Sequence, residues 1–502
     1  MGQMMPVEFQ GFSLEFILIF GSALLVFAVL ASRISSFTGV PALLIFLGLG
    51  MLAGSEGPGG VPFENYAVAF AVGSVCLSFV LFDGGLRTSW SGVRPILRVG
   101  TALSVISTVV TGVVTGLFAH YVLGLSLLGG LLLGAIVSST DAAAVFSILR
   151  SKNLSLRGKL KQVLEFEAGS NDPVAIFLTL SILSLITAES TGVFAIALFF
   201  VKQAGLGLLF GYAGAEGIRF LMNRAGIEYE ALYGVLMVGL VLMVFSITAY
   251  LGGSGFLAVY ITGLMLGRRD YLHKASITRF IDGVAWMSQI TIFLVLGLLV
   301  FPSNLILVWK EGLLLAVFMM FIARPLSVFV ATPGKSLERR ARLFVSWVGL
   351  RGAAPIILAT LPWSLGLPNA EYYFNLVFFI VLISVVAQGI SIPWVASKLK
   401  VTEPLLEEPA LEKAELGQLL PPGYVPIDAT MTFETSTKDL RIVDLQLPEG
   451  VLLTSIERDG RFIVPQGSTV VEAGDRIRGF AQESSVDELK TIFGRTRKLK
   501  TL

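Results

Sequence analysis

The sequence predicts an all-α polytopic membrane protein with about thirteen transmembrane helices, followed by a small C-terminal cytoplasmic α+β domain. Of its 502 residues, 54% are hydrophobic and only 14% are charged, a composition typical of a chain that crosses a bilayer many times. Apolar runs of about 20 residues recur as far as residue 397. Beyond that point the hydrophobic pattern shortens to the alternation of strands.

The apolar runs define the predicted spans. They cover residues 14–31, 40–54, 64–83, 97–118, 126–149, 164–188, 192–220, 229–250, 253–267, 281–301, 305–331, 341–361 and 372–396. The first run has no basic flank before it, so we interpret it as a span rather than a cleaved signal. Residues 1–397 are therefore expected to form one transmembrane domain embedded in the lipid bilayer.

Basic residues follow the odd-numbered spans. They are Arg33, Arg87, Arg94, Arg150, Lys152, Arg157, Lys159, Lys161, Arg219, Arg224, Arg268, Arg269, Lys274, Arg279, Lys335, Arg339, Arg340, Arg342, Lys398 and Lys400. The opposite loops hold Glu56, His120, Glu189, Glu371 and a single base, Lys310. Because positive charge is retained on the cytoplasmic side, we expect the N-terminus outside and the C-terminus in the cytoplasm.

The tail divides into a linker and a domain. Residues 398–426 are rich in glutamate and proline, which predicts a cytoplasmic linker. Residues 427–495 alternate as strands do, and Asp459-Gly460 predicts a hairpin turn. A capped helix is expected from Ser484 and Ser485 to Lys490.

Several acids lie in the predicted spans, where a carboxylate costs roughly 2.5–3.5 kcal/mol on insertion scales. Asp141 follows Ser139 and Thr140 in the fifth span, and the sixth contains Glu167 and Asp172. Carboxylate and hydroxyl oxygens suit hard monovalent cations. Glu167 and Asp172 lie roughly 140° apart around a helix, so they face different neighbours.

Two arginines accompany these acids. Arg324 in the eleventh span is the favoured structural partner of Glu167. Arg351 lies in the twelfth, within Gly349-Leu350-Arg351-Gly352 and ahead of Pro355, a pattern typical of an interrupted transporter helix. Arg351 has two open roles, either as a cap over the carbonyls of a broken helix or directly near the ion path.

At these residues the chain resembles the cation:proton antiporter family 1, in its NhaP-type branch. The resemblance rests on Thr140-Asp141, on Glu167 with Asn171 and Asp172, on Arg324, and on residues 349–353. The tail is similar to the TrkA-C (RCK-C) domain, a combination found in potassium/proton antiporters of the cell-volume-regulation type. The resemblance implies two inverted repeats, spans 1–6 and 8–13, with the fifth and twelfth spans unwound and crossing. It further implies a homodimer.

These residues lead to a mechanistic hypothesis. Asp172 binds one proton or one cation, Asp141 and Thr140 complete the ion shell, and Asn171 is neutral, so exchange is electroneutral and supports cation, pH or volume homeostasis. Two departures from the family pattern stand out, Ala142 in place of proline and Ala168 in place of the serine of many sodium-selective relatives. The missing hydroxyl at 168 favours potassium over sodium. A sodium/proton antiporter, and a ligand-gated cation channel or sensor, remain alternatives.

Other partners and activities are expected as follows. A nucleotide or similar small ligand is expected to regulate the tail domain, with Arg458 and Arg461 as candidate anion contacts. No residue constellation suggests an enzyme, a cofactor, or a metal other than the transported cation, since His120 and His273 lack metal-ligand spacing. The net charge of +2 does not suggest nucleic acid.

Overall fold

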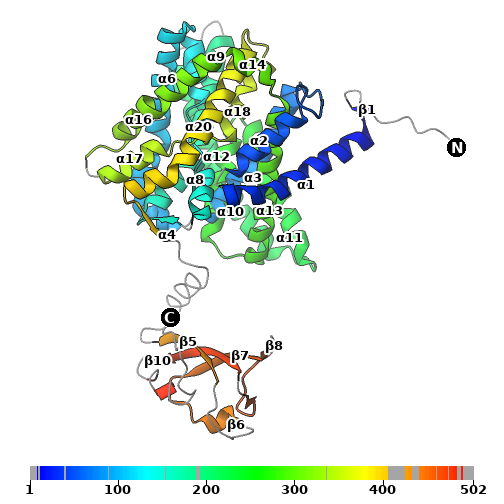
Figure 1. The fold of residues 1–502 in the computed structure, drawn as a ribbon, viewed down its shortest axis with the longest axis vertical. Coiled ribbons are helices and arrows are strands. Elements are labelled where there is room, and N and C mark those ends of the chain that lie inside the picture. Colours follow the sequence, from blue (N-terminus) through cyan, green and yellow to red (C-terminus); the bar gives the residue numbers. More distant parts are fainter. Residues whose placement is uncertain are drawn as a thin grey trace, which may run out of the picture. The chain divides into compact units, whose positions relative to one another are not determined.

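The computed structural model describes most of the membrane part and much of the tail. The described residues are 8–9, 12–38, 41–88, 90–152, 154–187, 193–334, 336–404, 424–431, 440–458, 461–472, 474–482, 485 and 488–489. The chain divides into two compact units, Met1–Pro404 and Leu405–Leu502. The first is a bundle of helices and the second a small domain built on a β-sheet (Figure 1).

Each of the thirteen predicted spans corresponds to apolar helix within the described residues. Eight stretches are long enough to cross a membrane: α3 (Tyr66–Arg87), Arg94–Leu123, α9 (Leu160–Thr187), α10 (Val193–Arg224), α11 (Glu230–Tyr250), α13 (Lys274–Leu298), Trp309–Ala331 and α20 (Ala370–Lys398). Five are shorter and belong to α1 (Leu14–Thr38), α2 (Ala42–Ala53), α7 (Leu127–Ile136), α12 (Gly255–Arg268) and α18–α19 (Ala353–Ala359 and Leu361–Ser364). The predicted all-α membrane fold is confirmed.

Two long spans are composite helices with a π-helical turn inside. The fourth span joins α4 (Trp90–Val93), the 3₁₀ turn η1 (Arg94–Ile96), α5 (Leu97–Ala102), the π-helix η2 (Leu103–Ser107) and α6 (Thr108–Leu123). The eleventh joins α15 (Trp309–Phe318), the π-helix η3 (Met319–Ala323) and α16 (Arg324–Ala331), after the short α14 (Pro302–Leu307). A π-helical turn inserts one residue into a helix and often marks a functional position.

The fifth and twelfth spans are interrupted, as expected. In the fifth, α7 ends at Ile136 and α8 (Ala142–Ser151) begins after a gap. In the twelfth, α17 (Arg339–Trp347) is separated from α18 by residues 348–352. The breaks and the π-helices therefore recur seven spans apart. Because seven is odd, equivalent spans cross the membrane in opposite directions, which is the signature of inverted repeats.

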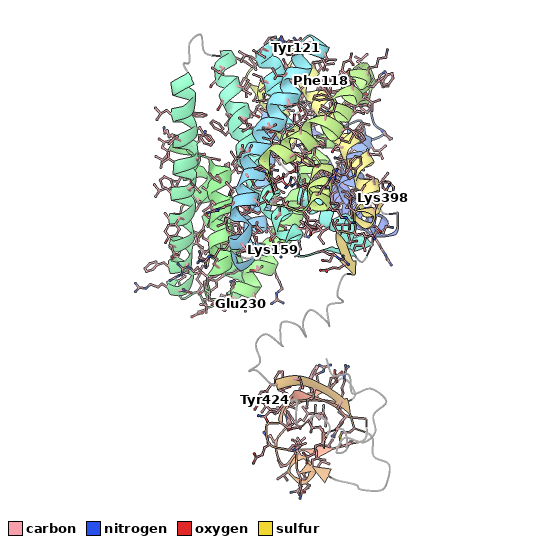
Figure 2. The ribbon with its side chains drawn as sticks, turned by 90° about the vertical axis from the view of Figure 1, so that its left-hand side faces the viewer. Phe118, Tyr121, Lys159, Glu230, Lys398 and Tyr424 are labelled. Carbon is pink, nitrogen blue, oxygen red and sulfur yellow. The ribbon has the colours of Figure 1, made fainter. Side chains whose placement is uncertain are left out.

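The helices pack so that the interrupted spans lie inside the bundle. Helix α3 packs against α12 and α13, α6 against α7, and α20 against α15 and α18. Figure 2 shows Lys159 and Glu230 at one end of the bundle and Tyr121 at the other. We call these the basic end and the opposite end.

The junction with the tail differs from the predicted linker 398–426. Strand β4 (Thr402–Pro404) pairs antiparallel with β3 (Leu154–Leu156), and the Arg157 N–H donates to the Val401 carbonyl oxygen at 2.9 Å. Lys398 still belongs to α20, and β5 begins at Tyr424. Both ends of the predicted linker are thus structured, because backbone pairing there outweighs the charge and proline content on which the linker was predicted.

The tail domain is a four-stranded antiparallel sheet in the order β5-β10-β7-β8. Its elements are β5 (Tyr424–Thr430), β6 (Leu440–Arg441), η4 (Ile442–Leu445), β7 (Leu452–Arg458), β8 (Arg461–Ile463), β9 (Val470–Val471) and β10 (Arg476–Gln482). Residues Ile427, Ile456 and Ile477 lie in its core. The strands on both sides of the predicted hairpin pair in register Arg458 to Arg461, whereas Asp459-Gly460 and most of the predicted helix after Ser485 lie outside the described residues. The short β1 (Glu8–Phe9) and β2 (Phe12–Ser13) pair near the N-terminus.

Candidate functional site

The two interrupted spans cross at Asp141 and Leu350. The Asp141 N–H donates to the Leu350 carbonyl oxygen at 2.7 Å. Asp141 stands immediately before α8, and its Oδ1 accepts from the Ala144 N–H at 3.4 Å. A carboxylate in this position caps the helix and lies at the positive end of its dipole.

Arg351 donates hydrogen bonds to backbone carbonyl groups at the break in the fifth span. Its Nη1 donates to the carbonyl oxygens of Ser138 and Ser139, both at 2.6 Å, and its backbone N–H donates to Ser384 Oγ at 3.2 Å. The side chain is buried. Buried carbonyl groups need such partners, so the geometry is that of the carbonyl cap, the first of the two roles considered for Arg351.

Asp172 faces this crossing from α9. It is partly buried and lies near the Asp141 carboxylate and the Ser139 hydroxyl. Next to it, Asn171 donates from Nδ2 to Thr140 Oγ1 at 2.7 Å. The Asn171 Oδ1 atom is buried and has no hydrogen-bond partner among the described residues. The structure thus brings Thr140, Asp141, Asn171 and Asp172 together.

Glu167 faces a different neighbour from Asp172, as its angular position predicts. Its Oε1 accepts from Arg324 Nη2 at 2.5 Å, and both side chains are almost fully buried. Arg324 Nη1 donates to Ser107 Oγ at 2.9 Å. The Glu167–Arg324 pair therefore holds α9 against the fourth and eleventh spans beside the oxygen cluster.

A group of buried hydroxyls that the sequence analysis did not identify surrounds Arg324. Ser107 and Ser327 lie 2.8 Å apart through their Oγ atoms, and Thr111 donates to Ser327 Oγ at 2.8 Å. Ser107 ends η2, and Arg324 directly follows η3. The two π-helical turns therefore meet at this network. The available signal was the spacing of hydroxyl residues along one face of an apolar span.

The oxygen cluster can bind a small cation or a proton. It combines two carboxylates, hydroxyl groups and a free amide oxygen, which are the ligands that hard cations prefer. Of the two nearby arginines, Arg324 pairs with Glu167, and Arg351 donates to carbonyl oxygens. The buried oxygen of Asn171, which has no partner among the described residues, is a group that a bound ion or water molecule would satisfy.

In the tail, Arg458 is engaged by the domain itself. It donates to both carboxylate oxygens of Asp475 and to the Val470 carbonyl oxygen, each at 2.8 Å, and it pairs with Glu472. Burial alone would raise the pKa of Asp475, but hydrogen bonds from Arg458 and from the Glu472 N–H outweigh it and hold that pKa below its usual range. The geometry favours a structural role for Arg458. The side chain of Arg461 lies outside the described part of the chain.

Comparisons with known proteins agree with this architecture. The model of the family described as sodium/hydrogen exchanger, transmembrane, matches residues 22–398, and that of the TrkA-C domain matches residues 435–494. The chain is 39% identical over 496 residues to the K(+)/H(+) antiporter NhaP2 of Shewanella sp. (strain MR-4). The matched region covers 97% of this chain and 85% of the relative. It is 27% identical over 344 residues to the Na(+)/H(+) antiporter NhaH of Halobacillus aidingensis, covering 65% and 82%.

The fold also matches a solved structure. The sodium proton antiporter MjNhaP1 from Methanocaldococcus jannaschii superposes with a TM-score of 0.65 at 24% identity, covering 74% of this chain and 98% of that one. A likeness at this identity establishes the fold alone. The chain therefore belongs to the sodium/hydrogen exchanger family of membrane transporters, with a C-terminal region that matches the TrkA-C domain.

Proposed function

We propose that this protein exchanges potassium ions for protons across the membrane, one for one. The observation that carries the proposal is the cluster at the crossing of the broken helices, where the carboxylates of Asp172 and Asp141 lie beside the hydrogen-bonded pair of Asn171 and Thr140. An anionic oxygen cluster inside a membrane protein marks an ion pathway.

Competition at Asp172 supplies the coupling. A cation bound by the ionised carboxylate excludes the proton, and the protonated carboxyl has no charge to offer a cation. Thr140, Asp141 and the free Asn171 oxygen complete the shell. Since Asn171 is neutral and Glu167 stays paired with Arg324, one carboxyl titrates per cycle, which makes the exchange electroneutral. Movement of the site between the two sides then gives alternating access.

Potassium is the favoured cation. Residue 168 is an alanine on the helix that carries Asp172, so it adds no hydroxyl ligand for a smaller, more strongly hydrated ion. The relative that matches over 97% of this chain bears a potassium/proton name, whereas the sodium/proton relative matches at 27% identity. Both observations support potassium over sodium without depending on one another.

The test is reconstitution with a pH-sensitive dye. Proteoliposomes preloaded with protons should dequench on addition of K⁺ or Rb⁺ more strongly than on addition of Na⁺ or Li⁺, and a planar bilayer should carry no current. A current that follows the potassium gradient without proton movement would establish the channel alternative instead. Dequenching by Na⁺ alone would establish the sodium/proton alternative.

The basic end is proposed to face the cytoplasm of a bacterial cell, in its inner membrane, with the N-terminus outside. The basic loops after odd-numbered spans support this orientation. The orientation can be tested with Tyr121→Cys and Lys159→Cys, each made in a Cys76→Ala background. A membrane-impermeant thiol reagent should label the first variant in intact cells and the second only after the cells are opened. A homodimer, the assembly implied by the family resemblance, should appear as a single cross-linked species of twice the protomer mass.

We infer that the tail regulates exchange through the β3–β4 pair. Strand β4 directly precedes the tail unit at Leu405, and β3 lies between α8, which follows Asp141, and α9, which carries Asp172. Leu156 and Val401 are buried where the two segments meet. A displacement of the chain at residue 405 would therefore move β4 and, through its pairing, β3. Strand β3 lies in the segment that joins α8 and α9, the two helices next to the ion-binding residues.

Two truncations separate regulation from transport. Ending the chain after Pro404 keeps β4 and should preserve exchange while abolishing any response to adenine nucleotides added at the cytoplasmic face. Ending it after Lys400 removes β4 as well and should change the exchange rate itself. Equal rates in both truncations would contradict a role for the strand pair, and an unchanged nucleotide response after removal of residues 405–502 would contradict a regulatory tail.

A further inference from the structure

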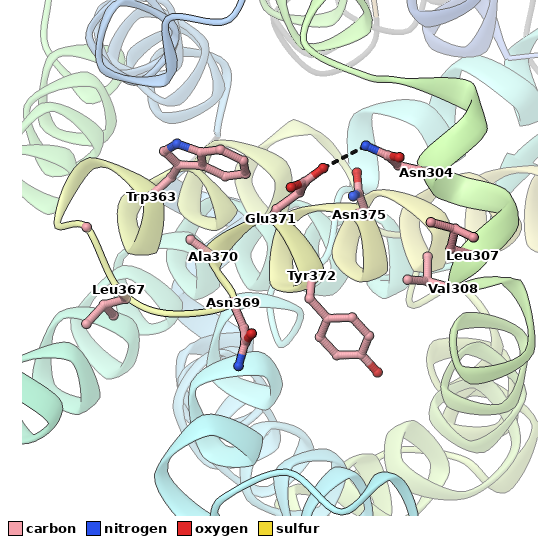
Figure 3. Close-up of a pocket in the computed structure, with 11 residues that line it drawn as sticks. Asn304, Leu307, Val308, Trp363, Leu367, Asn369, Ala370, Glu371, Tyr372 and Asn375 are labelled. Carbon is pink, nitrogen blue, oxygen red and sulfur yellow. Dashed lines mark hydrogen bonds between the residues drawn. The ribbon is translucent and has the colours of Figure 1, made fainter.

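A cavity of about 710 Å³ opens at the opposite end of the bundle, between α14, α19 and the start of α20 (Figure 3). Trp363, Leu307 and Val308 give it apolar walls, and Asn304, Asn369, Glu371 and Asn375 supply its polar groups. Its lining shares no residue with the oxygen cluster already described. By the proposed orientation, this end faces the outside.

The polar groups of this cavity are held in place. Glu371 Oε1 accepts from Asn304 Nδ2 at 2.6 Å, which ties the start of α20 to α14. Glu56 in turn accepts from the Ser303 N–H at 2.8 Å and from the Ser303 hydroxyl, which fixes the first turn of α14. Figure 3 shows Glu371, Asn304 and Asn375 close together on the cavity wall.

Asn375 is the observation that points to a ligand. It lies one turn after Glu371 on α20 and is only 6% exposed, yet its amide opens into the cavity and makes no hydrogen bond with a described residue. A buried amide without a protein partner is costly unless water or an ion satisfies it. Its carbonyl oxygen, the Asn304 carbonyl oxygen and the second Glu371 oxygen together offer oxygen ligands of the kind that monovalent cations take.

The charge around the cavity favours cations. Among the described residues, segments 54–65, 299–311 and 364–371 contain four acids, Glu56, Glu64, Glu311 and Glu371, and one base, Lys310. Acidic loops at the mouth of a low-dielectric body raise the local concentration of cations. The volume is enough for an ion that keeps much of its hydration, at roughly 30 Å³ per water.

Helix α20 connects this cavity to the helix crossing. Ser384, nine residues after Asn375 on the same helix, accepts a hydrogen bond from the backbone N–H of Arg351. Nine residues of α-helix span about 14 Å along the axis. We propose that Glu371, Asn375 and Asn304 form a second, weaker cation site, which captures partly hydrated K⁺ from the outer solution before it moves to Asp172. This inference rests on the proposed exchange of potassium for protons.

The test compares the two faces of the membrane. Right-side-out vesicles report the KM for outer K⁺, and everted vesicles report the KM for cytoplasmic K⁺. Glu371→Gln should raise the outer KM about three- to tenfold while kcat and the cytoplasmic KM stay unchanged. Asn375→Ala should raise the outer KM as well, without any change of charge. A folding defect would not be specific to one face.

Glu64→Gln is the matched control, because Glu64 is also exposed at this end but lines a neighbouring cavity without these asparagines. It should leave the outer KM within twofold of the wild-type value. If Glu371→Gln and Glu64→Gln raise the outer KM equally, the effect comes from the general negative charge of this end, and the proposed site is wrong. An unchanged outer KM in Asn375→Ala would also overturn the site. If the wild-type protein shows no potassium-driven proton movement, the proposed function fails first, before either variant is measured.

Discussion

Gly352 lies directly against Asp141. A β-carbon at position 352 would come within 2.5 Å of Asp141 Oδ2 and 2.7 Å of its Cβ. The φ of Gly352 is −105°, outside the left-handed region that favours glycine, and its close approach to Asp141 makes a steric requirement for glycine. The neighbouring Gly349 is similar, since a β-carbon there would lie 2.8 Å from Arg324 Nε. The two glycines of the twelfth span thus make room for an acid and for an arginine of the site.

Replacing Gly352 with alanine should displace the Asp141 carboxylate from the ion cluster. We expect potassium-driven proton exchange to fall at least tenfold, since small misplacements of reacting groups carry large penalties. Dequenching in proteoliposomes measures the loss. Gly239→Ala is the control, because Gly239 has open space around it within helix α11. An exchange rate in Gly352→Ala equal to that in Gly239→Ala would show that the close approach is not needed.

Breaking the Glu167–Arg324 pair from one side should destabilise the protein more than removing both partners. Arg324→Met leaves the buried Glu167 carboxylate without its arginine, a change that costs roughly 3–5 kcal/mol in other proteins. Glu167→Leu/Arg324→Met leaves no buried charge and should unfold at a higher temperature than the single variant. Thermal unfolding in detergent tests this order. A double variant that unfolds at or below the temperature of Arg324→Met contradicts it.

The hydroxyl of Ser107 should matter through Arg324. Ser107→Ala leaves Arg324 Nη1 without its buried acceptor, which costs about 1–3 kcal/mol, and Ser107→Thr should restore most of that stability. Ser32→Ala serves as the reference, since among the described residues the Ser32 hydroxyl bonds to the Val29 carbonyl oxygen of its own helix alone. Denaturation midpoints that are the same for Ser107→Ala and Ser32→Ala would remove Ser107 from the network.

Stability of the tail domain should depend on pH through Asp475. The lowered pKa of Asp475 means that its bonds with Arg458 stabilise the folded domain above the ordinary aspartate pKa of about 3.9. That contribution is lost as the pH falls through the lower pKa of the folded state. Arg458→Gln should therefore speed amide exchange of β7 and β10 at pH 7 but have little effect once Asp475 is protonated. A pH-independent difference between wild type and variant, after correction for intrinsic exchange rates, would exclude this account.

The sequence was most informative where a charge interrupts an apolar run. Asp141, Asp172 and Arg324 could be identified because lipid tolerates such groups only with a partner or a wet cavity. The thirteen spans followed from run length alone. The edges were less predictable: α13 begins at Lys274 rather than 281, since a helix continues past the hydrocarbon region once its residues are polar.

Other features are marked weakly or not at all in one sequence. Hydroxyls in apolar helices usually bond their own backbone, as Ser78 and Thr248 do, so residue type could not single out Ser107 or Ser327. A π-helical turn adds one residue without changing the apolar run. The β3–β4 pair joins three residues of a predicted loop with three of a predicted linker, and only the folded chain brings them together.

The central measurement is proton exchange in Asp172→Asn proteoliposomes loaded with a pH-sensitive dye. Asparagine keeps the size and the oxygen of the side chain but cannot ionise, so no potassium-dependent dequenching should remain, while Asp172→Glu should keep partial exchange. Dequenching of Asp172→Asn vesicles at the wild-type rate on addition of K⁺ would contradict the account, because the proton would then travel on another group.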